Sequence, residues 1–289
     1  MRRLYSVIAV LMLLAQVPAN AEGLSALWTQ YGVSDGVLKM SLHTDLNPLK
    51  PVSTKAELWL ERKGAWKKIA ETEVEALTAM AVFRIEGWNS RESIPYRVVC
   101  GSSRIEGIIR AEPKDKTILK LMAVACVNDK FFPYKKTVAQ MIAQDPDLIF
   151  FAGDQLYESN SGGNPVRAKK AKDVPRAMNN YLKKWRKFGL TFKDLLKDRP
   201  SIIITDDHDV YAQDLWGRGG IKMPGKRTAG GYLHPTWVNA AERTQVWHLP
   251  DAANPGPWGD DWTQFKRIPS IIRPAPVRRW PHRLSTGKG

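Results

Sequence analysis

Through residues 22–112 the chain alternates apolar and polar side chains with a period of two, which is typical of half-buried β-strands. Turn signals such as Ser34-Asp35-Gly36 and Lys63-Gly64 interrupt this alternation. Turn signals ~8–12 residues apart are characteristic of a small β-sandwich of the immunoglobulin or fibronectin type. We therefore predict such an N-terminal domain over 22–112, with strands near 57–61, 66–75, 79–88 and 96–100.

After a polar, strand-breaking stretch at 111–116, the hydrophobic pattern changes. Short apolar runs now alternate with longer amphipathic segments, which is the pattern of βαβ units around a parallel or mixed sheet. We predict strands at 118–125, 147–152 and 201–205 and helices at 136–144 and 175–196. The fold class is thus α+β or α/β, with the second domain spanning 113–255.

The first 21 residues form a processing signal rather than part of a fold. Arg2 and Arg3 precede an apolar run at 7–14, and Ala19-Asn20-Ala21 resembles a cleavage site, as in a secretory signal peptide. The run is too short for a bilayer span, which needs ~20 residues. We expect a periplasmic or secreted protein with no membrane span after cleavage; a retained membrane anchor is the alternative.

The formal net charge of +15 is concentrated in two regions. The first, 167–199, interleaves Lys and Arg with Tyr181, Trp185 and Phe188. It is interpreted as an amphipathic helix whose aromatic side chains face the core; a cationic rim that attracts phosphate esters is the alternative. The second, 256–289, is a basic, proline-rich tail that we expect to be disordered. Neither region predicts a specific nucleic-acid partner.

The two cysteines follow strands in different predicted domains, which does not favour a disulfide. We assign Cys100 to the core of the β-sandwich. The four tryptophans of the first domain are interpreted as core or inter-domain packing, with a sugar-facing surface as the alternative. They are Trp28, Trp59, Trp66 and Trp88.

Acidic side chains gather where the predicted parallel strands end. Asp206, Asp207, His208 and Asp209 follow 201–205 directly, and Asp154 follows 147–152. Adjacent carboxylates repel one another unless a cation compensates them, and the carboxyl ends of strands in open α/β sheets are where ligands bind. The pattern predicts a metal site; a solvated acidic turn that caps a helix is the alternative.

The order of these motifs resembles a known family. G-D-x-x-Y-E at 153–158 and D-D-H-D at 206–209, after a strand that ends at Cys126, are similar to the motifs of PhoD-like alkaline phosphatases/phosphodiesterases. This family belongs to the calcineurin-type metallophosphoesterases, and the resemblance covers roughly 24–255. It implies that the second domain is a metallophosphoesterase-type α/β domain.

The resemblance also implies a dinuclear metal site of Fe³⁺ and Ca²⁺, with another divalent metal as the alternative for the second ion. By this resemblance Asp154 bridges the two ions, while Tyr157 and Cys126 hold the ferric ion. Asp207 holds the second ion, and Asp206 is an alternative ligand. These are the expected metal residues.

For catalysis, the resemblance implies that His208 contacts the phosphate or protonates the leaving oxygen beside Asp207. We expect Asp206 and Asp209 to orient the ligands next to them. The substrate is then a phosphate mono- or diester, and we expect a monomer. Family members continue with a G-D-x-H-type segment that this sequence lacks. We therefore expect an incomplete domain with reduced or lost activity. The alternative is a non-catalytic exported fragment whose β-sandwich binds carbohydrate or a cell-wall polymer.

Overall fold

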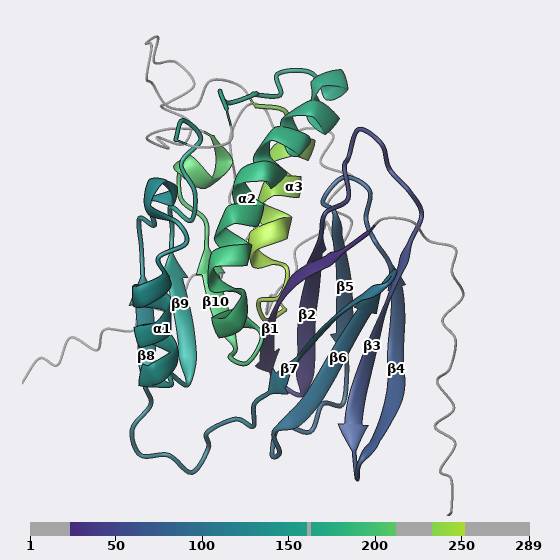
Figure 1. The fold of residues 1–289 in the computed structure, drawn as a ribbon, viewed down its shortest axis with the longest axis vertical. Coiled ribbons are helices and arrows are strands. Elements are labelled where there is room, and N and C mark those ends of the chain that lie inside the picture. Colours follow the sequence, from purple (N-terminus) through teal and green to yellow (C-terminus); the bar gives the residue numbers. More distant parts are fainter. Residues whose placement is uncertain (1–23, 161–162, 212–232, 252–289) are drawn as a thin grey trace, which may run out of the picture.

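The computed structural model describes residues 24–160, 163–211 and 233–251. A pair of antiparallel sheets lies on one side and a parallel sheet on the other, with helix α2 running between them (Figure 1). The predicted succession of a β-rich half and a mixed α/β half is therefore confirmed. The immunoglobulin or fibronectin type and the domain boundaries stay predictions.

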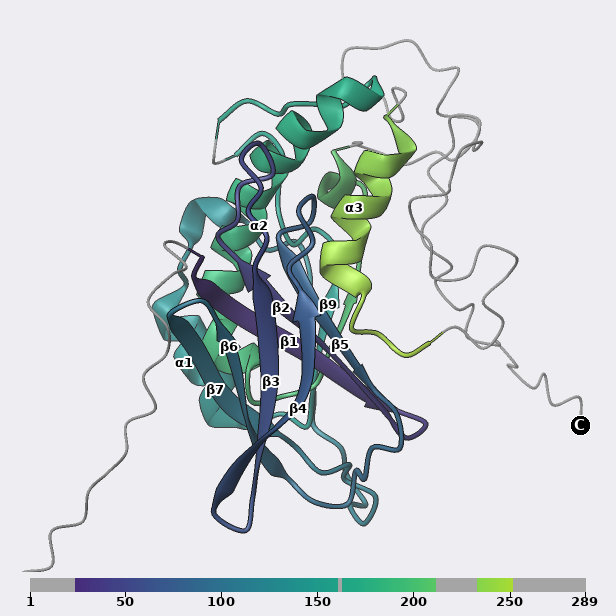
Figure 2. The ribbon, with the colours of Figure 1, turned by 90° about the vertical axis from the view of Figure 1, so that its right-hand side faces the viewer.

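The β-rich half, which faces the viewer in Figure 2, consists of two antiparallel sheets. One has the order β1-β2-β5 and the other the order β4-β3-β6-β7. Their strands are β1 (Ala26–Ser34), β2 (Val37–Thr44), β3 (Lys55–Arg62), β4 (Ala65–Glu73), β5 (Met80–Ile85), β6 (Ile94–Cys100) and β7 (Ser103–Ile109).

Period-two alternation explains the core of this half. Leu38, Met40 and Leu42 on β2 are fully buried, as are Leu58 on β3 and Val98 on β6. Successive side chains on a strand point to opposite faces, so each sheet turns one apolar face inward. All five side chains belong to the same hydrophobic cluster.

The second half contains a three-stranded parallel sheet with the order β10-β9-β8. Its strands are β8 (Leu121–Val124), β9 (Leu148–Ala152) and β10 (Ser201–Ile204), and its helices are α1 (Lys135–Gln144), α2 (Val174–Leu196) and α3 (Pro235–Val246). Strand β8 is shorter than predicted. Ile118 and Leu119 precede it and are 77% and 62% exposed, so their apolar character did not mark a buried strand.

Helix α2 joins the two halves. Tyr181, Trp185 and Phe188 are fully buried, which confirms the interpretation of this segment as an amphipathic helix with aromatic side chains in the core. Phe188 packs edge-on against Phe151 of β9, at 4.9 Å between ring centroids. Trp185 meets Trp28 of β1 on the other side, at 6.0 Å. The parallel sheet and the sandwich therefore share one continuous core.

Two buried histidines strengthen this junction. His43 stacks on Trp28 with 4.3 Å between ring centroids, and its Nδ1 accepts a hydrogen bond from Trp185 Nε1. His248, which follows α3, accepts from Gln30 Nε2 at Nδ1 and donates from Nε2 to the Ser201 carbonyl oxygen, each at 3.1 Å. In both rings an N–H donor faces Nδ1, so the neutral imidazole fits each site.

The tryptophans divide into two groups. Trp28 and Trp88 are buried, as predicted. Trp59 and Trp66 are only partly buried and are not core residues. Trp59 alternates with the buried Leu58 and Leu60, so the strand periodicity turns it to the opposite face.

Cys100 and Cys126 are free thiols, as predicted, and Cys100 is buried in the core. None of the helices in the described part of the chain has the length and apolar character that a bilayer crossing requires. The predicted signal peptide at 1–21 and the predicted tail at 256–289 lie outside the described residues.

Candidate metal centre

Three loops meet at the carboxyl ends of β8, β9 and β10. The loop after β8 is tied to the loop after β9 by two backbone hydrogen bonds, from Cys126 N to the Gly153 oxygen and from Val127 N to the Asp154 oxygen, at 3.1 and 2.9 Å. Parallel strands present their carboxyl ends at one edge of a sheet. The motifs at 153–158 and 206–209 therefore lie side by side although the chain separates them.

Asp154, Asp207 and His208 come together at this edge. Each offers one ligand atom, and these atoms lie within 4.8 Å of one another. Asp154 is 8% exposed, and its Oδ1 has no hydrogen-bond partner among the described residues. Burial raises the pKa of Asp154, the neighbouring His208 lowers it, and the Asp207 charge raises it again; the net direction is upward. An unpaired buried carboxylate beside a second carboxylate and an imidazole fits a cation.

Cys126 lies beside this group but is not one of the three converging residues, and Tyr157 lies next to His208. Cys126 Sγ is 3.7 Å from Asp154 Oδ2, and its backbone has a φ of 54°, in the left-handed region. The Tyr157 ring lies 4.4 Å from the His208 ring, between centroids. Burial, followed by the Asp154 charge, raises the pKa of Tyr157, so this phenol would need a cation to ionise near neutral pH.

Asp206 points elsewhere. Its side chain is exposed, and its Oδ1 accepts a hydrogen bond from Asp207 N at 2.8 Å. Within the described residues it is not one of the three residues whose ligand atoms converge. A Cβ added to Gly153 would lie only 2.7 Å from the Asp206 Cβ, so the loops after β9 and β10 are closely packed at this point.

His208 is held by Glu158, a residue to which the sequence alone assigned no role. His208 Nδ1 donates to Glu158 Oε2 at 2.6 Å, and Glu158 Oε1 pairs with Arg167 at 3.3 Å. Burial lowers the pKa of His208, but the hydrogen bond to Glu158 and the nearby carboxylates outweigh it, so the pKa is raised. The signal in the sequence was the Glu that closes the G-D-x-x-Y-E motif.

Asp209, the last residue of the second motif, is fully buried and does not face solvent with Asp206. It accepts hydrogen bonds from backbone N–H groups of both motifs. Gln155, another residue that the sequence did not single out, donates to it from its side chain at 3.2 Å.

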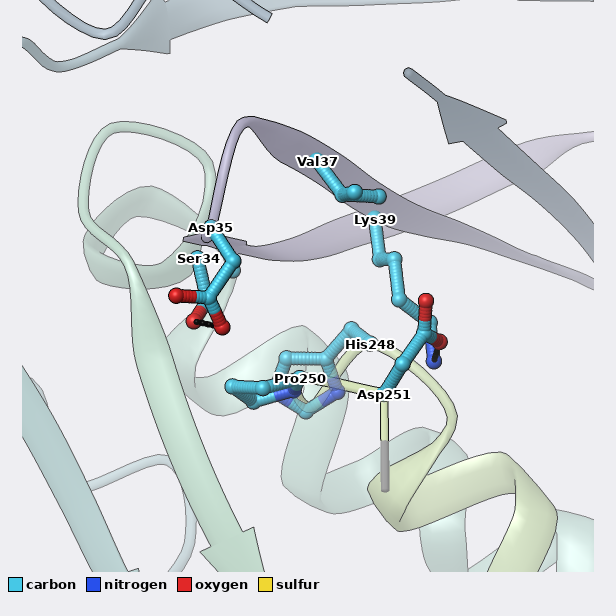
Figure 3. A pocket seen from close by; sticks show the side chains of 8 residues that line it. Ser34, Asp35, Val37, Lys39, His248, Pro250 and Asp251 are labelled. Atoms are coloured by element: carbon cyan, nitrogen blue, oxygen red, sulfur yellow. Dashed lines mark hydrogen bonds and ion pairs between the residues drawn. The ribbon is translucent and has the colours of Figure 1, made fainter. Parts of the chain in front are cut away.

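A small cavity of about 60 Å³ lies at a different place, between the β1–β2 hairpin and the segment after α3 (Figure 3). Lys39 and Asp251 form an ion pair of 3.1 Å at its wall. The cavity shares no lining residue with the convergent group. Its volume admits only a few water molecules, and it is not part of the candidate site.

Comparisons with known proteins identify a family and a similar fold. Residues 121–242 match the model of the PhoD-like phosphatase family. The fold is similar to a solved structure of PhoD, with a TM-score of 0.54 and 15% identity over 79% of this chain and 46% of that one. A purple acid phosphatase from yellow lupin (Lupinus luteus) seeds gives a TM-score of 0.46 and 8% identity over 78% and 40%. No curated protein matches the sequence. The chain thus spans less than half the length of the solved PhoD chain. The resemblance to PhoD-like phosphatases that the motifs predicted is confirmed by the family match.

Proposed function

We propose that this chain, whose residues 121–242 belong to the PhoD-like phosphatase family, is an exported, metal-dependent phosphoric ester hydrolase. The observation that supports it most directly is the convergence of Asp154, Asp207 and His208 within 4.8 Å. The substrate class is a phosphate mono- or diester.

The residues have distinct roles in this proposal. Asp154 and Asp207 would supply carboxylate oxygens to the metal pair, with Cys126 and Tyr157 as the proposed ligands of the ferric ion. When bound, such a pair polarises a phosphoryl oxygen and lowers the pKa of a coordinated water from ~15.7 toward ~7. Ca²⁺ as the second metal suits the carboxylate oxygens.

His208 is the proposed general acid. Its Nδ1 is engaged by Glu158, which leaves Nε2 to contact the phosphate or the leaving oxygen. The ring's raised pKa keeps more of it protonated near neutral pH, as protonation of a leaving alkoxide requires. Arg167, which pairs with Glu158, holds the carboxylate in place and does not itself act on the substrate.

One candidate sugar-stacking surface on the sandwich, the Trp66 ring, is partly covered. The Arg97 guanidinium lies over this ring, 4.1 Å from its centroid, and so occupies one face on which a sugar would stack. Trp59 Nε1 donates to Glu57 at 2.9 Å, in the same sheet. That bond lies in the plane of the indole and does not cover either ring face, so the carbohydrate-binding alternative is tested by experiment rather than by this surface.

The test is hydrolysis of bis-p-nitrophenyl phosphate and p-nitrophenyl phosphate by the purified chain, with Fe³⁺, Ca²⁺ or Mn²⁺ added. We expect release of p-nitrophenol that requires metal and disappears in Asp207→Ala. Asp194→Ala is the matched control, because Asp194 is an exposed carboxylate on α2. Release that persists in Asp207→Ala, or no metal-dependent release from either ester, would contradict the proposal.

A further inference from the structure

Asp209 accepts more hydrogen bonds than the carboxylates of the convergent group, yet it is not one of the three residues whose ligand atoms converge. Its side chain is fully buried. Oδ2 accepts from Asp154 N at 2.8 Å and from Asp206 N at 3.0 Å. Oδ1 accepts from Gln155 N at 2.9 Å and from Leu156 N at 3.3 Å. Four backbone N–H groups from two loops thus converge on one side chain.

A fifth donor completes the arrangement. Gln155 Nε2 donates to Asp209 Oδ2 at 3.2 Å and to the Ile204 carbonyl oxygen at 2.7 Å. Every one of these contacts is an N–H group, and none could accept a proton from a carboxylic acid. Both oxygens of Asp209 therefore act as hydrogen-bond acceptors, and each has at least two N–H donors.

The backbone that Asp209 holds is unusual. Asp154 has a φ of 54°, and Gly153 before it has a φ of 94°. The left-handed region disfavours an Asp without local support, and the hydrogen bond from Asp154 N to Asp209 supplies that support. This conformation directs the Asp154 side chain toward Asp207 and His208.

We propose that Asp209 is a positioning residue that sets the spacing between the loops after β9 and β10, and through it the distance between Asp154 and Asp207. One oxygen, Oδ2, bonds the amide of Asp154 on one loop and the amide of Asp206, next to Asp207, on the other. If the Asp154 amide or the Asp206 amide moved, the metal-binding carboxylate of Asp154 or of Asp207 would move with it. The inference rests on the proposed function, since it concerns the same metal-binding pair.

Asparagine does not replace Asp209, although the two side chains have the same shape. Both carboxylate oxygens face N–H donors, so either orientation of an amide would place its NH₂ group against two of them. Loss of outer hydrogen bonds to ligand-bearing groups typically lowers metal affinity ~10- to 100-fold. We expect a loss of this size in Asp209→Asn.

Gly153→Ala tests the same spacing without altering Asp209. An added Cβ would lie 2.7 Å from Asp206 Cβ, closer than real contacts, and the φ of 94° is unfavourable for alanine. The loops would have to separate. Tyr96→Phe serves as the stability control, because Tyr96 is a fully buried residue of the sandwich whose hydroxyl bonds Thr29 and the Lys197 oxygen.

The experiment measures Mn²⁺ binding by calorimetry and the melting temperature of the metal-free chain, for wild type and the three variants. We expect Asp209→Asn and Gly153→Ala to bind Mn²⁺ at least ~10-fold more weakly, while Tyr96→Phe melts lower and binds Mn²⁺ as wild type does. If Asp209→Asn does not fold, the Mn²⁺ affinity of Gly153→Ala is the measurement that tests the proposed spacing of the two loops.

Each remaining result counts against a specific claim. If Asp209→Asn melts lower but binds Mn²⁺ within about twofold of wild type, Asp209 serves only the stability of the fold and the inference fails while the proposed function stands. If Asp209→Asn does not fold and Gly153→Ala binds as wild type does, the inference also fails. If wild type binds no Mn²⁺, the proposed function and the inference fail together.

Discussion

Glu158 Oε2 lies 2.6 Å from His208 Nδ1, so a buried carboxylate fixes both the orientation and the tautomer of the one imidazole at the candidate metal centre. A hydrogen bond from Nδ1 to a carboxylate is a common way to orient a functional histidine. Glu158 is 3% exposed and has Arg167 on its other oxygen.

Glu158→Gln should lower the pKa of His208. The amide can still accept from Nδ1, but it carries no charge, while the burial that lowers this pKa remains. At a given pH near neutrality, less of the ring would then be protonated. NMR titration of the metal-free chain measures this directly, and Glu106→Gln on the sandwich surface should leave the titration unchanged. An equal or higher pKa in Glu158→Gln would show that Glu158 does not govern the ring.

Asp154→Asn should abolish binding of both metals. The substitution keeps the size of the side chain but removes the charge of the buried carboxylate at the centre of the group. Elemental analysis of the purified variant gives the metal content. Asp147→Asn at the opposite end of β9 is the control, since Asp147 pairs with Lys116 and should not affect the metals. Unchanged metal content in Asp154→Asn would remove Asp154 from the ligand set.

Tyr157→Phe should bleach an iron-loaded chain. A phenolate bound to a ferric ion absorbs visible light through charge transfer, and phenylalanine has no oxygen to provide. The absorption spectrum after Fe³⁺ loading is the measurement. Tyr134→Phe is the control, because the Tyr134 hydroxyl donates to the Asn128 carbonyl oxygen. A colourless wild-type chain with bound iron would argue against Tyr157 as a ligand.

Acid should destabilise the fold through His248 and His43. Burial lowers the pKa of His248 to about 3, and it lowers the pKa of His43 well below its ordinary value. Below pH ~6.5 these histidines become protonated in the unfolded chain but stay neutral in the folded protein. The free energy of unfolding is therefore highest above that pH and falls by up to ~1.4 kcal/mol per pH unit for each histidine as the pH decreases.

The check is the free energy of unfolding between pH 8 and 5. His248→Gln should be less stable than wild type at pH 8 but should lose stability less steeply as the pH falls. Equal slopes for the two proteins would mean that His248 does not contribute to the acid sensitivity.

Gly189→Ala should destabilise the chain although alanine favours helices. The gain in helix propensity is ~1 kcal/mol, whereas overpacking a filled core costs ~1–3 kcal/mol. A Cβ at Gly189 would lie 2.2 Å from the Trp28 ring, on which His43 is stacked. We expect a lower urea midpoint for Gly189→Ala and little change for Lys183→Ala on the same helix. A raised midpoint would mean that Trp28 can move aside.

The sequence by itself predicted many of the strands, the helices α1 and α2, and the meeting of two acidic motifs, but not helix α3 or the short length of β8. Period-two alternation sets the strands of the sandwich, and strand-to-helix alternation makes the second sheet parallel, so the carboxyl ends of β9 and β10 are adjacent. The same alternation puts Trp59 and the buried Leu58 on opposite faces of β3. The prediction that the four tryptophans pack in the core did not take this alternation into account.

Only the tertiary structure decided how the acidic side chains are used. In the run 206–209, Asp206 is exposed, Asp207 is partly buried and Asp209 is fully buried. A single 3₁₀ turn, His208–Val210, rotates neighbouring residues to different sides of the chain, and no periodic pattern resolves so short a turn. The partners of His208 and Asp209 lie some 50 residues earlier, and their contacts depend on how two loops pack together. Local propensity fixes elements, whereas long-range packing fixes which carboxylate joins the convergent group and which faces backbone amides.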